Sequence, residues 1–415
     1  MRALSTMRRL TLIPQGITIV VSAFLPIFAI VTMLPAVPSL IDHFGSDPAA
    51  HWKVPMMVAA PGLTIALTAP FAGWLVDILG RRNLLIAATF LYGIIGTLPF
   101  FVESLDFLFA SRFALGLCEA AILTIVNTLL GDYWDDSGRR DWLFIQGLVG
   151  PFLASGVILL AGPVTALRWN GIFLVYAVAF PIALAMLLFL FEPTAAQREA
   201  VPTGEPSVKQ GFPWGWIMLT GSVTLLTATL YYVFSINGGL AFREVGVTNP
   251  AHLSELIVIP SLFVMLGALV FRLLGGTANA VQLAAFFIIL GLGLVGIGLA
   301  PDYRWMVAAV IVQQIGTGMT VPSLIAWTQT RLPVQHRGRG MGVWTACFFL
   351  GQFVSPWLVH RFGLLTGSIQ GAFLMMGLIG LVSGLVAAAS LVRRSRLVHA
   401  SAGKEAAPRA SGANT

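Results

Sequence analysis

The chain has few charged residues for its length. Its 415 residues include 24 Lys+Arg and 17 Asp+Glu, which makes 10% charged, against ~25% in an ordinary soluble domain. Apolar residues reach 57%. A soluble globule of this size needs a more polar surface, and disordered chains are rich in charge and poor in apolar residues. The composition therefore excludes a soluble enzyme or scaffold, and it excludes a disordered protein.

Residue types that carry most enzyme chemistry are also scarce. The two cysteines, Cys118 and Cys347, lie in apolar surroundings and cannot build a disulfide framework. The three lysines, Lys53, Lys209 and Lys404, lie in no glycine-rich phosphate loop, which excludes a P-loop ATPase. Metal-ligand spacing, a nucleophile elbow and a dinucleotide fingerprint are missing too. We expect no enzyme activity, no metal and no cofactor.

Long charge-free runs are what the sequence has instead. Most reach the ~20 residues that a helix needs to cross a ~30 Å hydrocarbon core, and they are continuous, unlike the alternating ~10-residue strands of a membrane barrel. One further apolar stretch, residues 107–131, is interrupted only by Arg112 and Glu119. The sequence thus predicts an all-α integral membrane protein with twelve transmembrane helices. The charge-free runs cover residues 10–41, 54–76, 83–102, 142–167, 169–191, 210–242, 256–271, 273–301, 305–330, 341–360 and 362–392.

The positions of the basic residues predict the orientation. With an even number of spans both termini share one side, and most of the 24 Lys and Arg residues fall in the loops of that side. The positive-inside rule then places both termini in the cytoplasm of a multi-pass protein of the inner (plasma) membrane. The net charge of +7 is therefore a topology signal and does not require nucleic acid. The basic residues in the opposite loops are Lys53, Arg168, Arg243, Arg304 and Arg361.

The chain divides into two similar halves. Its longest polar interruption, which contains Pro193, Pro202 and Pro206, follows the sixth span and reads as a linker. Internal repeats are common in secondary transporters, and three short matches occur in order at a nearly constant offset. We expect two pseudo-symmetric six-helix bundles, 1–191 and 213–392, a cytoplasmic linker, 192–212, and a disordered cytoplasmic tail, 393–415. The matches pair 73–80 with 267–275, 112–116 with 314–318, and 138–140 with 337–339.

Several motifs carry a family resemblance that spans both halves. The segment with Gly73, Asp77, Gly80, Arg81 and Arg82 resembles the loop signature of the major facilitator superfamily. Residues 111–116 resemble its fourth-helix pattern, and residues 332–342 resemble its loop between helices ten and eleven. The pair Gly150-Pro151 resembles a degraded motif of its drug/proton antiporters. The run from Gly116 through Glu119 to Ala120 is similar to its Spinster-like and organic-anion branches.

The resemblance implies roles for the loop residues. Asp77 and Arg81, with Gly73, Gly80 and Arg82, would form a gate that latches the two halves together in the outward-open state. The alternative is a solvated helix end with topology-setting arginines. Gly150 and Pro151 are expected to serve helix packing or a kink.

Arg112 and Glu119 are the only charged residues well inside a predicted span. An ionisable group in hydrocarbon costs at least ~2.5–3.5 kcal/mol, so it normally faces a cavity or a partner. Seven residues on a 3.6-residue period put both side chains on one helix face, ~10 Å apart along the axis. We interpret Glu119 as a proton-coupling carboxyl and Arg112 as its partner or as an anion-binding residue. A structural pair that braces the fourth span to a neighbour is the alternative.

Polar and aromatic residues within spans are candidate substrate contacts, because in the family helices one, four, seven and ten line the cavity. Each could equally be a contact between helices. The candidates are Phe24, Phe28 and Met33 on the first span, Asn127 on the fourth, Tyr231, Tyr232 and Asn237 on the seventh, and Gln313, Gln314 and Trp327 on the tenth.

The sequence favours one function over two alternatives. We expect a monomeric, proton-coupled secondary transporter that works by alternating access and exports a small, partly apolar molecule. Its partners would be that substrate, protons and the bilayer. The first alternative is proton symport of an organic anion, with Arg112 binding the carboxylate. A passive channel or lipid scramblase is the second.

Overall fold

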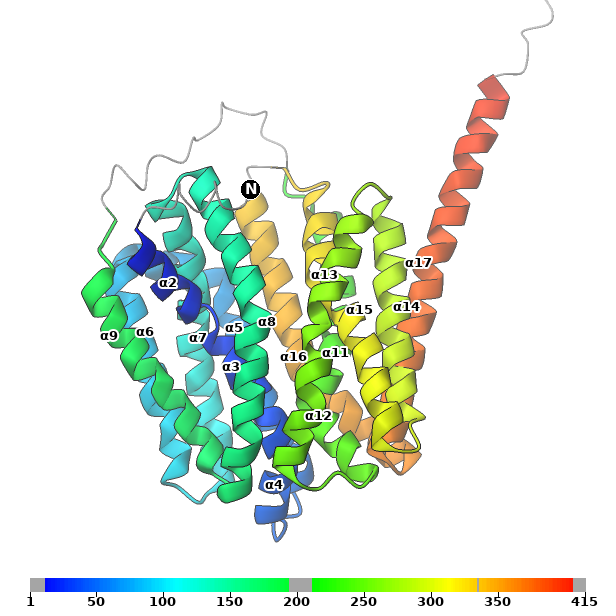
Figure 1. Ribbon diagram of the computed structural model, residues 1–415. Coiled ribbons are helices and arrows are strands. Elements are labelled where there is room, and N and C mark those ends of the chain that lie inside the picture. Colours follow the sequence, from blue (N-terminus) through cyan, green and yellow to red (C-terminus); the bar gives the residue numbers. More distant parts are fainter. Residues whose placement is uncertain (1–11, 194–210, 334–335, 406–415) are drawn as a thin grey trace, which may run out of the picture.

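A computed structural model of the chain describes residues 12–193, 211–333 and 336–405. The side chains of residue 70, residues 72–79, residue 136 and residues 391–405 lie outside this description. Within it, 12 helical segments are long and apolar enough to cross a membrane, as the charge-free runs predict. In Figure 1 they stand side by side as two bundles, with the start of the first described helix, the chain ends at residues 193 and 211, and the C-terminal end of the last helix on one face. We call this the linker face and the other the far face.

The first six spans form the N-terminal bundle. The first span is broken into three pieces at Phe24 and Thr32, and Pro26 lies in the first turn of the second piece. Ser104 and Asp135 cap the helices that follow them, because each side chain accepts a hydrogen bond from a backbone N–H of the first turn. The elements are α2 (Ile13–Ser22), α3 (Leu25–Val31), α4 (Met33–His43), α5 (Ala50–Leu79), α6 (Arg81–Thr97), η1 (Leu98–Phe100), α7 (Leu105–Tyr133), α8 (Asp136–Leu167), η2 (Gly171–Val178) and α9 (Ala179–Phe189).

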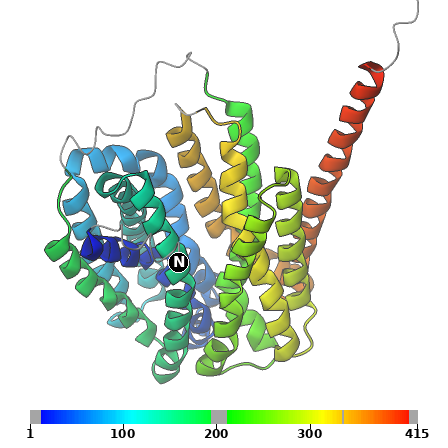
Figure 2. The same cartoon turned by 45° about the horizontal axis from the view of Figure 1, so that its top comes forward.

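The other six spans form the C-terminal bundle, which Figure 2 shows beside the first from a tilted direction. Its second span is broken at Phe263, three residues after Pro260 removes a backbone donor. The last helix continues past residue 392, where the last predicted span ends, to Glu405. Residues 406–415 of the predicted tail lie outside the described residues. The elements are α11 (Trp214–Glu244), α12 (Pro250–Leu262), α13 (Val264–Leu273), α14 (Asn279–Gly298), α15 (Tyr303–Gln329), α16 (Arg337–Thr366) and α17 (Ile369–Glu405).

The bundles meet mainly along three helix pairs. Helix α5 packs on α16, α8 packs on α12, and α4 packs on α11. Near the far face the Nη1 atom of Arg243 lies 2.7 Å from Oδ1 of Asp42, an ion pair that joins the end of α11 to the end of α4. At mid-depth the Ser155 and Ser261 hydroxyls are 2.7 Å apart and join α8 to α12. These two polar contacts therefore join the halves at mid-depth and near the far face.

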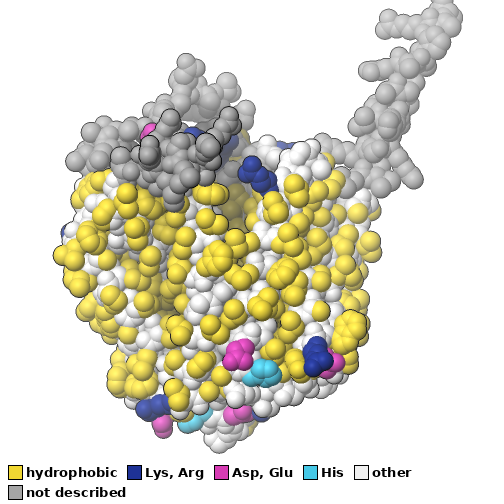
Figure 3. Space-filling view, viewed as in Figure 1, with side chains coloured by type: hydrophobic (Ala, Val, Ile, Leu, Met, Phe, Trp, Pro, Cys, Tyr) yellow, Lys and Arg dark blue, Asp and Glu magenta, His cyan; other side chains and the backbone are white. Residues whose placement is uncertain are grey.

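The surface has the distribution that a bilayer requires. Figure 3 shows a broad hydrophobic belt, with charged side chains gathered toward the two ends of the molecule. Large apolar side chains are exposed on this belt, including Phe71, Phe144, Leu188 and Leu385. In water such exposure would be unfavourable, whereas in lipid it carries no penalty.

Candidate functional site

Helix α7 buries the predicted ionisable pair in the N-terminal bundle. Arg112 is 2% exposed and Glu119 is 1% exposed, so both are removed from solvent and from lipid. The guanidinium of Arg112 lies over two aromatic rings of η2, 5.3 Å from the centre of Phe173 and 5.1 Å from that of Tyr176. Its Nε donates a 3.3 Å hydrogen bond to the Ser111 hydroxyl. The arginine is therefore held by cation–π contacts to the sixth span.

The two charged groups do not contact each other directly. Neither terminal nitrogen of Arg112 has a hydrogen-bond partner among the described residues, and the same holds for the buried Oε1 atom of Glu119. An unpaired buried charge costs several kcal/mol. A direct salt bridge that braces α7, one form of the structural alternative, is not what this conformation contains. The pair is instead two buried ionisable groups on one helix, without a direct contact between them.

A cavity of about 520 Å³ lies between the bundles. On α8 it runs from Leu143, near the linker face, to Ile158, deeper in the membrane, and on α15 it runs from Gln314 to Val321. The cavity thus extends from near the linker face to the depth of the Ser155–Ser261 contact and slightly beyond it, because Ser261, Ile158 and Ile257 also line it. The predicted residues that line it are Phe24, Tyr231 and Gln314, together with Gly150 and Pro151.

Gly150 allows an aromatic ring to pack closely against the cavity wall. A methyl group added at position 150 would lie 2.6 Å from the ring of Phe24, so only glycine lets the ring pack against α8. The prediction assigned Gly150 and Pro151 to helix packing. In the structure they also shape the cavity wall.

The other predicted contact residues are absent from the described lining of this cavity. Gln313 donates a 2.9 Å hydrogen bond to Thr317, and Asn237 and Asn127 donate to carbonyls one turn back in their own helices. Trp327 packs on Trp216 near the linker face. The remaining three are Met33, which is 1% exposed, Tyr232, which packs on Phe348, and Phe28, which borders a small void beside Tyr92 and Tyr176.

The loop signature on the linker face is tied down within the N-terminal bundle. Gly80 has a φ of +80°, which favours glycine, and it ends α5 in a sharp turn. Arg81 forms a close ion pair with Asp132 of α7. The side chain of Glu192 accepts backbone hydrogen bonds from Arg81 and Arg82 at 2.9 and 2.8 Å, and Arg82 donates to the carbonyls of Leu187 and Leu190.

Of the predicted gate, the structure describes the side chains of Arg81 and Arg82 and the backbone turn at Gly80. The side chains of Asp77 and Gly73 lie outside the described residues. Sequence reasoning missed Glu192, which was assigned to the linker but ties down the signature loop. Glu192 is the first charged residue after the sixth span and directly precedes Pro193, and this position was the sequence signal that could have identified it.

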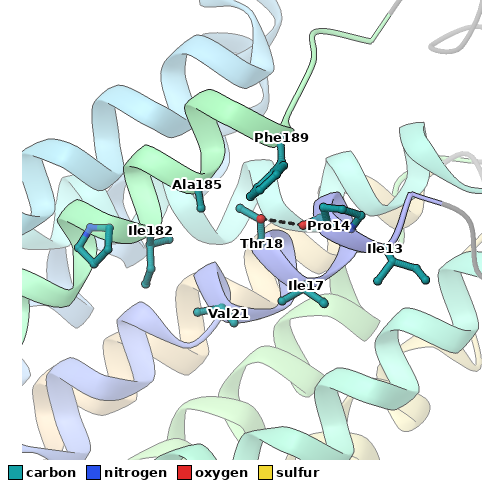
Figure 4. Close-up of a pocket in the computed structure, with 9 residues that line it drawn as sticks. Ile13, Pro14, Ile17, Thr18, Val21, Ile182, Ala185 and Phe189 are labelled. Carbon is teal, nitrogen blue, oxygen red and sulfur yellow. Dashed lines mark hydrogen bonds between the residues drawn. The ribbon is translucent and has the colours of Figure 1, made fainter.

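A second groove, in the N-terminal bundle, lacks free polar groups among its described residues. It has a volume of about 430 Å³, lies between α2 and α9, and is lined by side chains such as Ile17, Val21 and Phe189 (Figure 4). Its one hydroxyl, on Thr18, donates to the Pro14 carbonyl in the same helix. The described lining of this groove therefore offers a ligand only apolar surface.

The described residues contain no group of three or more His, Cys, Asp or Glu side chains that could hold a metal ion.

Comparison with known proteins decides the family. A family model of the Major Facilitator Superfamily matches residues 19–282 and 281–413. The chain belongs to the major facilitator superfamily. It is a multi-pass membrane transporter, since the family and its relatives are transporters and not enzymes.

Curated relatives match parts of the chain. The efflux pump dotC of Dothistroma septosporum is 26% identical over 210 residues, which are 50% of this chain and 34% of that protein. The 4-hydroxybenzoate transporter PcaK of Pseudomonas aeruginosa is 28% identical over 177 residues, 42% of this chain and 38% of that protein. The matched region thus spans little more than a third of either relative.

Solved structures share the fold along nearly the whole chain. The nucleoside transporter NupG aligns with a TM-score of 0.72 at 12% identity, covering 90% of this chain and 99% of that one. The human organic anion transporter MFSD10 (TETRAN) aligns with a TM-score of 0.66 at 14% identity, covering 91% and 99%. At these identities the likeness establishes the fold of this superfamily member and no more.

Proposed function

We propose that this transporter exports a small, partly apolar molecule in exchange for protons, with Glu119 as the proton site. The observation that supports it is a carboxyl that is 1% exposed and that, with Arg112, makes up the buried charge of an otherwise apolar α7 core. Such a group sits in a membrane helix at a substantial cost, which fold stability alone does not explain.

In this proposal the linker face is cytoplasmic and the structure is the inward-facing state. The arginine-rich loops favour that orientation. The cavity extends from mid-depth toward the linker face, and the Asp42–Arg243 pair joins the halves near the far face. Substrate enters from the cytoplasmic half, and rocking of the bundles then exposes the cavity to the other side.

The test is pH-driven transport by a Glu119→Gln variant in proteoliposomes. Gln keeps the size of the side chain but cannot bind and release a proton, so the variant should lose transport of Nile red, an uncharged lipophilic dye, when a pH gradient is imposed. Glu103→Gln is the matched control, since the same change at this exposed carboxyl on the far face should leave transport unaltered. Undiminished pH-driven transport by Glu119→Gln would contradict the assignment.

Uptake of an aromatic anion is the second candidate, favoured by the similarity to the 4-hydroxybenzoate transporter. In that case Arg112 would bind the carboxylate. Its guanidinium is covered by Phe173 and Tyr176 and is absent from the described cavity lining, which argues for the first candidate. An Arg112→Lys variant that loses 4-hydroxybenzoate uptake but keeps Nile red transport would favour the second.

A further inference from the structure

We propose that the cavity between the bundles binds an uncharged aromatic molecule through two amides, Gln146 of α8 and Gln314 of α15, one from each half. We call this the two-amide site. The inference rests on the proposed transport function and narrows its substrate class. Three properties of the cavity carry it: the charge of its walls, its free hydrogen-bonding groups and its aromatic surfaces.

The first property is the lack of charge. Among the described residues that line the cavity, none is Asp, Glu, Lys, Arg or His. A ligand that carries a net charge would lose its hydration without gaining an opposite charge, which costs several kcal/mol even when part of the solvation is retained. The nearest buried cation of the N-terminal bundle, Arg112, is held against two rings of η2. The walls therefore favour an uncharged ligand over an organic anion or cation.

The second property is a set of polar groups without partners. Gln314 is 9% exposed, and its amide makes no hydrogen bond within the described part of the chain. The Oε1 atom of Gln146 is buried and likewise lacks a partner among the described residues. An amide offers both a donor and an acceptor, whichever way it is flipped, so each glutamine can bind a hydroxyl, an amide or a carbonyl. Buried groups of this kind normally have a partner, and a ligand in the cavity would supply it.

The remaining polar groups of the cavity leave these amides as the main anchors. Ser261 is already hydrogen-bonded to Ser155 across the halves, and the Thr317 hydroxyl is bonded to Gln313. The hydroxyls of Tyr231 and Ser235 have no partner among the described residues and would add further contacts. The two amides on opposite walls are the groups of the site that offer both a donor and an acceptor from separate atoms.

The third property is the aromatic wall. Phe24, Tyr231 and Phe234 line the cavity from both halves, and Phe24 is held in place by its contact with Gly150. Aromatic faces of this kind favour a planar ring. The volume of about 520 Å³ lies within the range of small-molecule sites. A planar, uncharged body with at least one hydrogen-bonding group satisfies both the rings and the amides.

The placement of the amides also connects binding to transport. A ligand that hydrogen-bonds to Gln146 and Gln314 together bridges the two bundles. It would favour whichever conformation brings both amides within reach, and a ligand can shift a conformational equilibrium only by such a difference in affinity. Neither glutamine is charged, so this recognition is separate from the proton site on α7.

The experiment is equilibrium binding to the full chain in lipid nanodiscs, without any gradient. Three matched probes separate charge from hydrogen bonding: methyl 4-hydroxybenzoate, which is uncharged; 4-hydroxybenzoate, its anion counterpart; and methyl 4-methylbenzoate, which lacks the hydroxyl. We expect the hydroxy ester to bind at least tenfold more tightly than the anion and about tenfold more tightly than the methyl analogue. Tighter binding of the anion, or no binding of the hydroxy ester, would overturn the proposal.

Variants of the two amides test the anchors. Gln146→Met and Gln314→Met keep the side-chain size and should each weaken binding of the hydroxy ester by about fivefold to tenfold. Gln329→Met is the matched control, because Gln329 lies exposed at the linker end of the same helix as Gln314. Gln314→Asn keeps an amide and should retain part of the affinity, which separates lost hydrogen bonding from lost folding. Wild-type affinity in both Met variants would overturn the two-amide site.

Failure of the two-amide site can be told apart from failure of the proton-coupling proposal. Glu119→Gln should bind the hydroxy ester with wild-type affinity, because Glu119 is not among the described residues of the cavity lining. Loss of ester binding in Glu119→Gln would overturn the separation of recognition from proton binding. Normal binding with undiminished pH-driven transport would overturn the proton proposal alone.

Discussion

The two bundles place different chemistry at equivalent positions. On α7 of the N-terminal bundle, Arg112 is buried against aromatic rings and Glu119 follows two turns later. The repeat matches Arg112 with Gln314 on α15, where the buried groups are the neutral amides of Gln313 and Gln314. One half therefore holds ionisable groups away from the cavity, whereas the other presents uncharged polar groups to it.

The loops after the second and eighth spans also differ in charge and in how firmly their arginines are bound. In the N-terminal bundle, Arg81 and Arg82 are bound by Asp132, Glu192 and the end of α9. In the C-terminal bundle the matching segment holds only Arg272, which is exposed, and Gln282 donates to the Leu274 carbonyl. In the proposed mechanism the N-terminal half therefore binds the proton, whereas both halves bind the substrate.

The largest effect on transport is expected when the buried positive charge of Arg112 is removed. Arg112→Met removes the opposite charge on the same helix as Glu119, so the carboxyl should exchange its proton less readily and pH-driven Nile red transport should fall roughly 100-fold. Gln314→Met at the matching position should only weaken ligand binding. Equal loss of coupling in both variants, measured in the same proteoliposomes, would remove the distinction between the halves.

An intermediate effect is expected at the loops. The Arg81–Asp132 pair is largely buried, with side-chain exposures of 13% and 9%, so Arg81→Gln should destabilise the protein by about 3 kcal/mol. Arg272→Gln at the exposed C-terminal counterpart should change stability by less than about 0.5 kcal/mol. Thermal unfolding of both variants in the same detergent checks this. Similar melting temperatures would show that the N-terminal loop is no more tightly held than the other.

The smallest effect is expected at the far-face contact between the halves. Asp42 and Arg243 are about half exposed, and exposed ion pairs contribute up to about 1 kcal/mol. Asp42→Asn should therefore shift the balance between inward- and outward-facing states by no more than about fivefold. Distances between spin labels on the two bundles can measure this shift. A complete change to the outward-facing state would mean that this pair, and not helix packing, closes the far face.

The sequence predicted the fold well because the signals it used are local and strong. Eleven runs free of charge, together with the stretch 107–131 that holds Arg112 and Glu119, correspond to the 12 spans, and the motifs at 73–82 and 111–116 led to the correct family. The burial of Arg112 and Glu119 also followed, since a charge in the middle of a span must face inward.

The site was predicted less completely, because its members come from helices that lie far apart in the chain. Gln146 is one polar residue in a long apolar run, and nothing local marks it as a cavity residue, whereas its neighbours Gly150 and Pro151 were singled out for packing. Gln313 and Gln314 are adjacent in the sequence, but one bonds to Thr317 and the other lines the cavity. Helix rotation, which the sequence does not give to within one residue, decides between them.

The central claim is that proton coupling and substrate recognition lie in separate places. The most direct measurement compares Glu119→Gln with wild type in one preparation, recording binding of methyl 4-hydroxybenzoate without a gradient and transport of Nile red with an imposed pH gradient. We predict that binding stays within about twofold of wild type, while pH-driven transport is lost. Retained pH-driven transport, or loss of binding together with transport, would contradict the account.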